Sequence, residues 1–140
     1  MSFRLLASIV RDRNPVMLPL DATVKSACSE MWQRRVGSVL VVDRSLRLRG
    51  IFTGRDAVRA LAEGRDAGAT RVEEVMTRDP VSLPPGADAL DALHAMCDGG
   101  FRHIPVVDGE SICGVVSRGD FKGVEIDRID EEEHLWECVR

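Results

Sequence analysis

The chain has 140 residues, of which 44% are hydrophobic, 30% charged and 4% aromatic. These proportions are typical of one globular domain and exclude a disordered or collagen-like chain. The formal net charge is −4, and residues 125–140 carry seven acidic and two basic side chains, so the rest of the chain is nearly neutral. No broad basic face follows from this distribution, which argues against nucleic acid as the main partner.

The N-terminal apolar run, residues 5–10, is too short for a signal peptide with its cleavage site or for a membrane span. We therefore expect a cytoplasmic protein with no membrane partner. The four cysteines lie far apart in the sequence and form no C-x-x-C pair, so neither a disulfide framework nor a zinc site is expected. His134 and Cys138 stand four residues apart, but this single pair is weak support for a metal site.

The second half of the chain repeats the first half. In residues 13–19 (RNPVMLP) and 78–84 (RDPVSLP), an Arg, a Leu and two Pro match at an offset of 65 residues. Two further blocks keep the same order, with one deletion before the last: residues 41–43 match 106–108, and residues 50–56 match 114–120. Chance does not readily produce three ordered blocks, so the chain is interpreted as two copies of one unit.

Each copy predicts one amphipathic helix at the same place. Apolar side chains recur at positions i, i+3, i+4, i+7 and i+8, which is the stripe of a helix with one buried face. The stripe consists of Val24, Ala27, Cys28, Met31 and Trp32 in the first copy, and of Ala89, Ala92, Leu93, Met96 and Cys97 in the second. Thr23 and Asp88 precede the stripes, where a side-chain oxygen can cap the first free backbone N–H groups. The last two residues of each stripe are interpreted as core or dimer-face residues.

Two short β-rich runs follow each helix. They predict strands at residues 38–42 and 50–53 in the first copy, and at residues 103–107 and 114–117 in the second. A further helix is expected to begin near Arg55 in the first copy and near Gly119 in the second. Together with a strand ahead of each stripe, this order makes each copy a β-α-β-β-α unit.

A single module is expected to span residues 1–140. Its first repeat covers residues 9–66 and its second residues 74–128, joined by a turn rich in Gly and Ala. Residues 129–140 are expected to form an acidic C-terminal helix or tail with solvated charges, which could also be an interaction surface. Three apolar residues are expected to pack this segment inward: Ile126, Ile129 and Trp136.

Three segments resemble the cystathionine β-synthase (CBS) domain: residues 75–81, 101–108 and 114–120. In their order, spacing and duplication they are similar to a tandem CBS pair, or Bateman module, over about residues 9–124. The resemblance implies an α/β (α+β) fold of two β-α-β-β-α units packed about a pseudo-twofold axis. It also implies that the two clefts between the repeats bind adenosine-containing ligands such as AMP, ADP or ATP, and that the chain pairs into a homodimer.

The pattern Ser/Thr-x-x-Asp recurs at matched positions, as Thr53 to Asp56 and as Ser117 to Asp120. A hydroxyl at a strand end and the N–H groups that open the next helix can face a phosphate, and the carboxylate can accept hydrogen bonds from both ribose hydroxyls. The alternative is a capping box that only starts a helix. Because the pattern occurs twice inside the repeat, we favour ribose binding at Asp56 and Asp120 and phosphate binding at Thr53 and Ser117.

The two sites are expected to be unequal. Arg102, His103 and Arg118 can give the second copy positive charge, whereas the first copy offers only Arg55 nearby. Ser117 and Asp120 are therefore expected to form the better phosphate site, although His103 could instead be a half-buried strand residue that bonds to the backbone. The resemblance places the adenine pocket at four residues: Val16, Val81, Ile104 and Pro105.

Enzymatic motifs are missing from the sequence. There is no Walker A sequence, no G-x-G-x-x-G and no recognisable nucleophile with a base, so we expect no catalytic residues and no obligatory cofactor. We interpret the chain as a stand-alone regulatory module that senses AMP, ADP or ATP, with S-adenosylmethionine or NAD as second choices, and signals to a separate, unidentified protein. The alternatives are a ligand-free dimeric interaction scaffold and, more remotely, a metal-dependent hydrolase.

Overall fold

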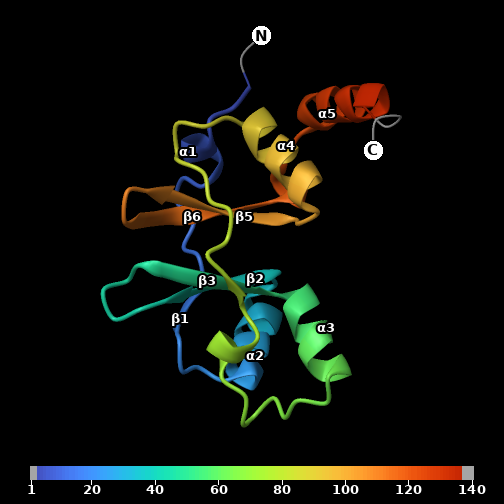
Figure 1. Cartoon of the computed structure of the whole chain (residues 1–140). Helices are drawn as coiled ribbons and strands as arrows, with labels where there is room; N and C mark the ends of the chain where they lie inside the picture. The colour runs from blue at the N-terminus through green and yellow to red at the C-terminus, as the bar shows by residue number, and fades with distance from the viewer. Residues whose placement is uncertain (1–2, 137–140) are drawn as a thin grey trace. The chain divides into compact units, whose positions relative to one another are not determined.

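The computed structural model describes the backbone of residues 3–136 and the side chains of residues 3–132 (Figure 1). Two compact units are present, and they are not simply the two halves of the sequence. The first-repeat unit contains residues 14–80 and 110–112, and the second-repeat unit contains the described parts of residues 1–13, 81–109 and 113–140. Helices and strands are mixed in both units, which confirms the predicted α/β (α+β) class.

The first-repeat unit is a four-stranded sheet with helices on one side. Its strands are β1 (Met17–Pro19), β2 (Ser38–Val42), β3 (Leu48–Thr53) and β4 (Thr77–Arg78), in that order across the sheet. β1 runs parallel to β2, whereas β2, β3 and β4 pair in antiparallel fashion. Helices α2 (Val24–Arg34) and α3 (Gly54–Ala62) pack against β2 and β3, and a 3₁₀ turn, η1 (Val72–Glu74), precedes β4 (Figure 1).

The second-repeat unit keeps this order with a smaller sheet. It contains α1 (Leu6–Ile9), α4 (Ala89–Gly99), the paired strands β5 (His103–Asp108) and β6 (Ser111–Ser117), the 3₁₀ turn η2 (Arg118–Asp120) and α5 (Gly123–Trp136). The strand expected before α4 is reduced to a single parallel bridge between Leu83 and Val106. This bridge matches the parallel pairing of Leu18 with Val41 in the first repeat, so the duplication extends to the strand register.

Each unit includes the segment that opens the other sequence repeat. β4, at the start of the second repeat, pairs with β3 of the first-repeat unit. Residues 4–10, ahead of the first repeat, are bound to the second-repeat unit: the Leu6 N–H donates to Ala87 O at 2.8 Å, and the Ala89 N–H donates to Arg4 O at 2.8 Å. This exchange brings the opening segments close to residues that are distant in sequence.

Both predicted helix starts are confirmed by their caps. Thr23 Oγ1 accepts a hydrogen bond from the Ser26 N–H at 3.0 Å, and Asp88 Oδ1 accepts one from the Asp91 N–H at 2.9 Å. The two helices also end alike, with Arg35 (φ 55°) and Gly100 (φ 71°) in the left-handed conformation. Gly adopts this conformation without cost, whereas an arginine there is strained.

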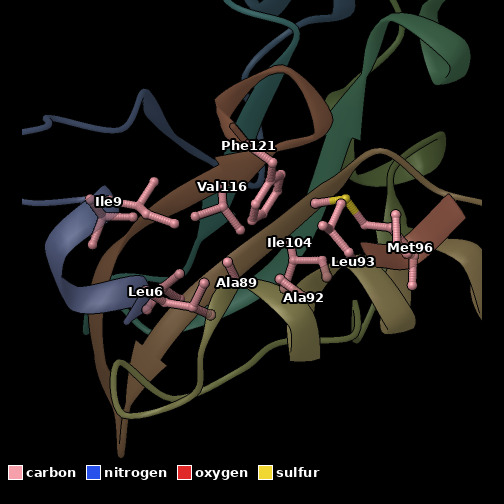
Figure 2. Close-up of a cluster of buried hydrophobic side chains, with 12 residues drawn as sticks. Leu6, Ile9, Ala89, Ala92, Leu93, Met96, Ile104, Val116 and Phe121 are labelled. Carbon is pink, nitrogen blue, oxygen red and sulfur yellow. The ribbon is translucent and has the colours of Figure 1, made fainter. Parts of the chain in front are cut away.

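The apolar stripes supply much of the two cores. In the second-repeat unit, α1 and α4 place buried side chains against the two strands and Phe121 (Figure 2). In the first-repeat unit, Val24, Ala27 and Met31 are buried against the sheet. Trp32 was predicted to be a core or a dimer-face residue. It is 85% exposed on the surface of α2, so the prediction of a core position is wrong.

The end of the second repeat differs from the expectation in two respects. The helix expected near Gly119 is only the turn η2, because Phe121 is extended (φ −89°, ψ 144°) and 6% exposed within the core. β6 begins at Ser111, earlier than expected, because the β5–β6 connection is a tight turn with Gly109 at φ 61°.

The described part of the acidic C-terminal segment, residues 129–136, belongs to α5, which begins at Gly123. Ile129 is 1% exposed and Ile126 is partly buried against the same core, as expected, whereas the side chain of Trp136 lies outside the described residues. α5 is the longest described helix, and within residues 3–136 no helix is both long and apolar enough to cross a membrane.

Candidate functional site

The Ser117 to Asp120 motif forms a tight loop at the end of β6. η2 folds the Asp120 carboxylate back, so that Oδ2 accepts hydrogen bonds from the Ser117 N–H at 2.7 Å and from the Ser117 hydroxyl at 3.3 Å. Arg13 Nη1 lies 2.9 Å from the same oxygen. The Asp120 side chain remains 17% exposed. Because these three contacts converge on Oδ2, the other carboxylate oxygen has capacity for further hydrogen bonds.

Asp120 shares an electrostatic environment with three basic residues. Burial raises the pKa of Asp120, but hydrogen bonds from Arg13 and Ser117 and the charge of Arg13 outweigh it and hold the pKa below its ordinary value. Burial lowers the pKa of His103, the charge of Arg102 lowers it further, and the Asp120 carboxylate raises it in part. The His103 imidazole is therefore neutral at pH 7, beside an ionised Asp120.

Arg118 adds a cationic guanidinium to this loop, and one of its nitrogens lacks a hydrogen-bond acceptor among the described residues. Its backbone N–H donates to Arg102 O at 2.9 Å, which ties η2 to the residue ahead of β5. Arg118 Nη1 is buried and has no hydrogen-bond partner among the described residues. Buried N–H groups normally have an acceptor. A negatively charged ligand group beside Arg118 would satisfy this nitrogen.

The matching loop in the first-repeat unit is more enclosed. Asp56 Oδ2 accepts from the Thr53 N–H at 3.0 Å, and Thr53 Oγ1 accepts from the Asp56 N–H at 3.4 Å, which is a complete capping box at the start of α3. Asp56 Oδ1 accepts from the Thr77 hydroxyl at 3.4 Å, and Asp56 is only 7% exposed. Arg55, in the first turn of α3, is exposed. Both carboxylate oxygens of Asp56 thus accept hydrogen bonds from residues of the first-repeat unit.

The four residues named for the adenine ring are divided between the two units. Val81, Ile104 and Pro105 belong to the second-repeat unit, and Val16 belongs to the first-repeat unit. Val81 is 50% exposed, whereas Ile104 is fully buried in the core (Figure 2). Pro105 is also buried, and its carbonyl accepts from the Leu83 N–H at 3.1 Å. Val16 is 6% exposed. Val81 is the one of the four with an accessible side chain.

Two residues that contact the paired aspartates were not predicted, namely Arg13 at Asp120 and Thr77 at Asp56. Both come from the opening segments that are exchanged between the units. A signal was present in the repeat alignment, where Arg13 matches Arg78, the residue after Thr77. The two arginines differ in the structure, because Arg78 donates to Glu73 O at 3.1 Å.

A second arginine of the N-terminal segment connects the Asp120 loop to α5. The Arg4 guanidinium donates to both carboxylate oxygens of Glu125, at 3.0 and 2.7 Å, and to Asp120 O at 3.0 Å. Glu125 also accepts from the Lys122 N–H at 2.7 Å. The hydrogen bond from Arg4 is the main reason that the pKa of Glu125 lies below its ordinary value. Arg4 thus bridges the loop and the first turn of α5.

The described residues contain no group of three or more His, Cys, Asp or Glu side chains placed to hold a metal ion. The side chains of His134 and Cys138, the pair at ligand spacing, lie outside the described part of the chain.

Comparisons with known proteins identify relatives over most of the chain. A family model for the CBS domain matches residues 7–63 and again residues 72–126. The CBS domain-containing protein YhcV of Bacillus subtilis is 40% identical over 101 residues, which cover 71% of each protein. CBSCBSPB3 of Arabidopsis thaliana is 41% identical over 100 residues, or 71% of this chain, but the match spans about a fifth (18%) of that longer protein.

The fold is also found among solved structures. The CBS domain protein PAE2072 from Pyrobaculum aerophilum, complexed with AMP, superimposes with a TM-score of 0.81. The match covers 91% of this chain and 98% of that chain, at 23% sequence identity. At this identity, the likeness establishes the shared fold.

Proposed function

The chain belongs to the CBS domain family, and from this premise we propose that it is a regulatory, non-catalytic module that binds an adenosine-containing ligand. The preferred ligands are AMP, ADP and ATP, ahead of S-adenosylmethionine and NAD. The AMP complex of PAE2072, which has the same fold, supports this choice. The observation that carries the proposal is the Asp120 loop, where a partly exposed carboxylate lies beside a hydroxyl and several cationic side chains.

The Asp120 loop supplies the groups that a nucleotide requires. Asp120 Oδ1 can accept one ribose hydroxyl directly, and the second hydroxyl would bind Oδ2 in place of a contact that is already there. Arg118 Nη1, which lacks an acceptor, suits a phosphate oxygen. Arg102, directly ahead of β5, adds positive charge, and the neutral imidazole of His103, the first residue of β5, adds a hydrogen-bonding ring nitrogen. Ser117 donates its hydroxyl hydrogen to Asp120, and turning that hydrogen to a phosphate oxygen would give up this bond.

The first-repeat unit is proposed as a weaker second site. Asp56 and Thr53 carry the same motif, but their capping box and Thr77 already satisfy the carboxylate. Nucleotide hydroxyls would have to replace bonds that exist, and burial leaves little of Asp56 accessible. We therefore expect the Asp120 site to fill first.

An apolar surface for the adenine ring is proposed around Val81 and the adjoining strand residues Ile104 and Pro105, with Val16 as the corresponding residue of the first repeat. Val81 is half exposed, which fits a ring-contacting side chain. Ile104 and Pro105 are buried, so their contribution would come from the backbone edge and from fixing the position of the strand. In this proposal, residues 9–66 and 74–128 act as the two repeats of one module, with residues 129–140 as its acidic tail.

Occupancy is proposed to reach a separate protein through α5. The Asp120 carbonyl, Arg4 and Glu125 form a continuous set of hydrogen bonds that ends in the first turn of this helix. A ligand that moves the Asp120 carboxylate would also disturb the hydrogen bond that Arg4 donates to the Asp120 carbonyl oxygen. Because Arg4 also holds Glu125, a bound state with Arg4 in another position would favour another position of α5.

A homodimer is proposed through the helical face of the first-repeat unit. Trp32 on α2 is 85% exposed, and on the neighbouring helix α3 Val58 and Leu61 are 67% and 78% exposed. Val58 and Leu61 are three residues apart and so share one face of α3. A tryptophan alone can bury about 150–250 Å². Covering this face with a second copy would remove a large apolar area from water, at about 25 cal/mol per Å².

A thermal-shift screen tests the ligand proposal. The purified chain is heated with AMP, ADP, ATP, NAD, S-adenosylmethionine or GTP, because a ligand that binds only the folded state raises the melting temperature. We expect saturable stabilisation by an adenine nucleotide. The Asp120→Asn variant, which keeps the size of the side chain, should lose it, whereas Asp98→Asn, at an exposed position on α4, should retain it.

The same screen separates the sensor from a ligand-free scaffold. If no adenosine-containing compound shifts the melting temperature at millimolar concentration, the adenine proposal is wrong and the dimeric scaffold is favoured. If GTP stabilises the chain as much as ATP, the site recognises nucleotides without selecting adenine.

A further inference from the structure

Arg13 occupies the carboxylate to which the proposed function assigns the ribose. Its Nη1 lies 2.9 Å from Asp120 Oδ2, the oxygen that also accepts both hydrogen bonds from Ser117. A ribose that donates one hydroxyl hydrogen bond to each carboxylate oxygen of Asp120 finds capacity at Oδ1, but at Oδ2 it competes with this ion pair. The fate of Arg13 therefore affects what the site can bind.

The backbone of Arg13 is anchored while its side chain is accessible. The Arg13 N–H donates to Val10 O at 3.1 Å in the turn that follows α1, and Asp12 within that turn has φ 62°. The Arg13 side chain is 44% exposed, against 17% for that of Asp120. An arginine with a fixed backbone and a long, partly exposed side chain can change partner without any change of fold.

The ion pair is not a requirement of the motif, because the other copy lacks it. Asp56 makes the same bonds to Thr53 that Asp120 makes to Ser117, and it is completed by the Thr77 hydroxyl. The arginine that matches Arg13, Arg78, donates to a carbonyl oxygen instead. One Ser/Thr-x-x-Asp loop is thus stable without an arginine on its carboxylate, so the Arg13 contact is specific to the second loop.

We propose that Arg13 is a specificity-determining residue that exchanges Asp120 for the phosphate of the bound nucleotide; this inference rests on the proposed function. In the unliganded chain, Arg13 neutralises Asp120. When ribose hydroxyls bind to Asp120, the guanidinium turns to the phosphate, for which its planar donors are suited. A nucleoside without phosphate displaces Arg13 from Asp120 but offers the guanidinium no phosphate oxygen as a new acceptor. Arg13 therefore selects nucleotides over nucleosides.

Calorimetric titration of AMP and of adenosine tests this inference. In Arg13→Gln, AMP should bind about tenfold more weakly, equivalent to about 1.4 kcal/mol, because a charge-assisted hydrogen bond to the phosphate is lost. Adenosine should bind equally well or more tightly, because its competitor for Asp120 has been removed. Arg13→Lys, which keeps the charge, should retain part of the AMP affinity.

Arg11→Gln is the matched control, since Arg11 lies in the same segment, is exposed and forms no ion pair among the described residues. It should leave both affinities unchanged, and the melting temperature of each variant reports on its fold. Equal weakening of AMP and adenosine in Arg13→Gln, or no change in either, would overturn the assignment of Arg13 while leaving the proposed function intact. If the unmodified chain binds neither compound, this inference fails, and the thermal-shift screen with the other adenosine-containing compounds decides the proposed function.

Discussion

The contact between Arg4 and Glu125 is expected to be a main determinant of stability in the second-repeat unit. Arg4 makes two charge-assisted hydrogen bonds to a carboxylate that is 5% exposed, and a third to Asp120 O. Removing one partner of a fully buried pair costs about 3–5 kcal/mol. Because Arg4 is itself 34% exposed, we expect the lower cost of about 2 kcal/mol for Arg4→Ala, from charged hydrogen bonds worth about 1.5–3 kcal/mol.

For a chain of this size, about 2 kcal/mol corresponds to a decrease in melting temperature of roughly 6 °C. Urea unfolding followed by circular dichroism measures the free energy directly. Arg11→Ala serves as the control. The double variant Arg4→Ala/Glu125→Gln should recover part of the loss, because the buried charge left by the single variant is then absent. A loss in Arg4→Ala no greater than that in Arg11→Ala would refute the reasoning.

The same contact predicts a pH dependence. Hydrogen bonding to Arg4 first, aided by Lys122, holds the pKa of Glu125 below its ordinary value despite burial. A carboxyl whose pKa is lower in the folded state stabilises the fold above its unfolded pKa of about 4.3, and this contribution is lost as the pH falls through the folded value. The stability advantage of the unmodified chain over Glu125→Gln should therefore be full at pH 7 and shrink below about pH 4. An advantage that stays constant to pH 3 would contradict the assignment.

Two further predictions concern the helices. Trp32→Glu should convert the homodimer to a monomer in sedimentation equilibrium. The control Leu46→Asn, at an exposed position in the β2–β3 turn with φ 63°, should remain dimeric. If Trp32→Glu is still a dimer, the helical face with Trp32 is not the dimer interface. Arg35 and Gly100 both have left-handed backbone conformations, which favour glycine. Arg35→Gly should therefore raise the free energy of unfolding by about 0.5 kcal/mol, and Gly100→Ala should lower it by about 1 kcal/mol. If urea unfolding shows that both variants change the free energy in the same direction, the result would be inconsistent with these conformations.

The duplication explains why much of the fold could be predicted from the sequence. Two copies of one hydrophobic pattern report on the same structure, so the helices at α2 and α4, their capping residues and the strands β2 and β3 followed from local periodicity. The exposure of Trp32 could not follow, because the stripe gives the direction of the buried face but not its width. The early start expected for the last helix failed because Phe121 is drawn into a core that local propensity does not describe.

The candidate site was predictable only in part. The aspartates and hydroxyls lie within single motifs, so a matched spacing was enough to identify them. Arg13 and Thr77 reach these motifs through the exchange of opening segments between units, and such pairing depends on topology rather than on spacing. The repeat alone also could not show that Asp56 is buried while the Asp120 side chain remains partly exposed.

The central claim is that the Asp120 loop binds an adenine nucleotide. Isothermal titration of AMP into the unmodified chain, Asp120→Asn and Asp56→Asn tests it most directly. We predict saturable binding to the unmodified chain, a loss of at least about tenfold in Asp120→Asn for the charge-assisted bonds to ribose, and a smaller loss in Asp56→Asn. The absence of binding by AMP, ADP and ATP to the unmodified chain at millimolar concentration, or full affinity in Asp120→Asn, would contradict the account.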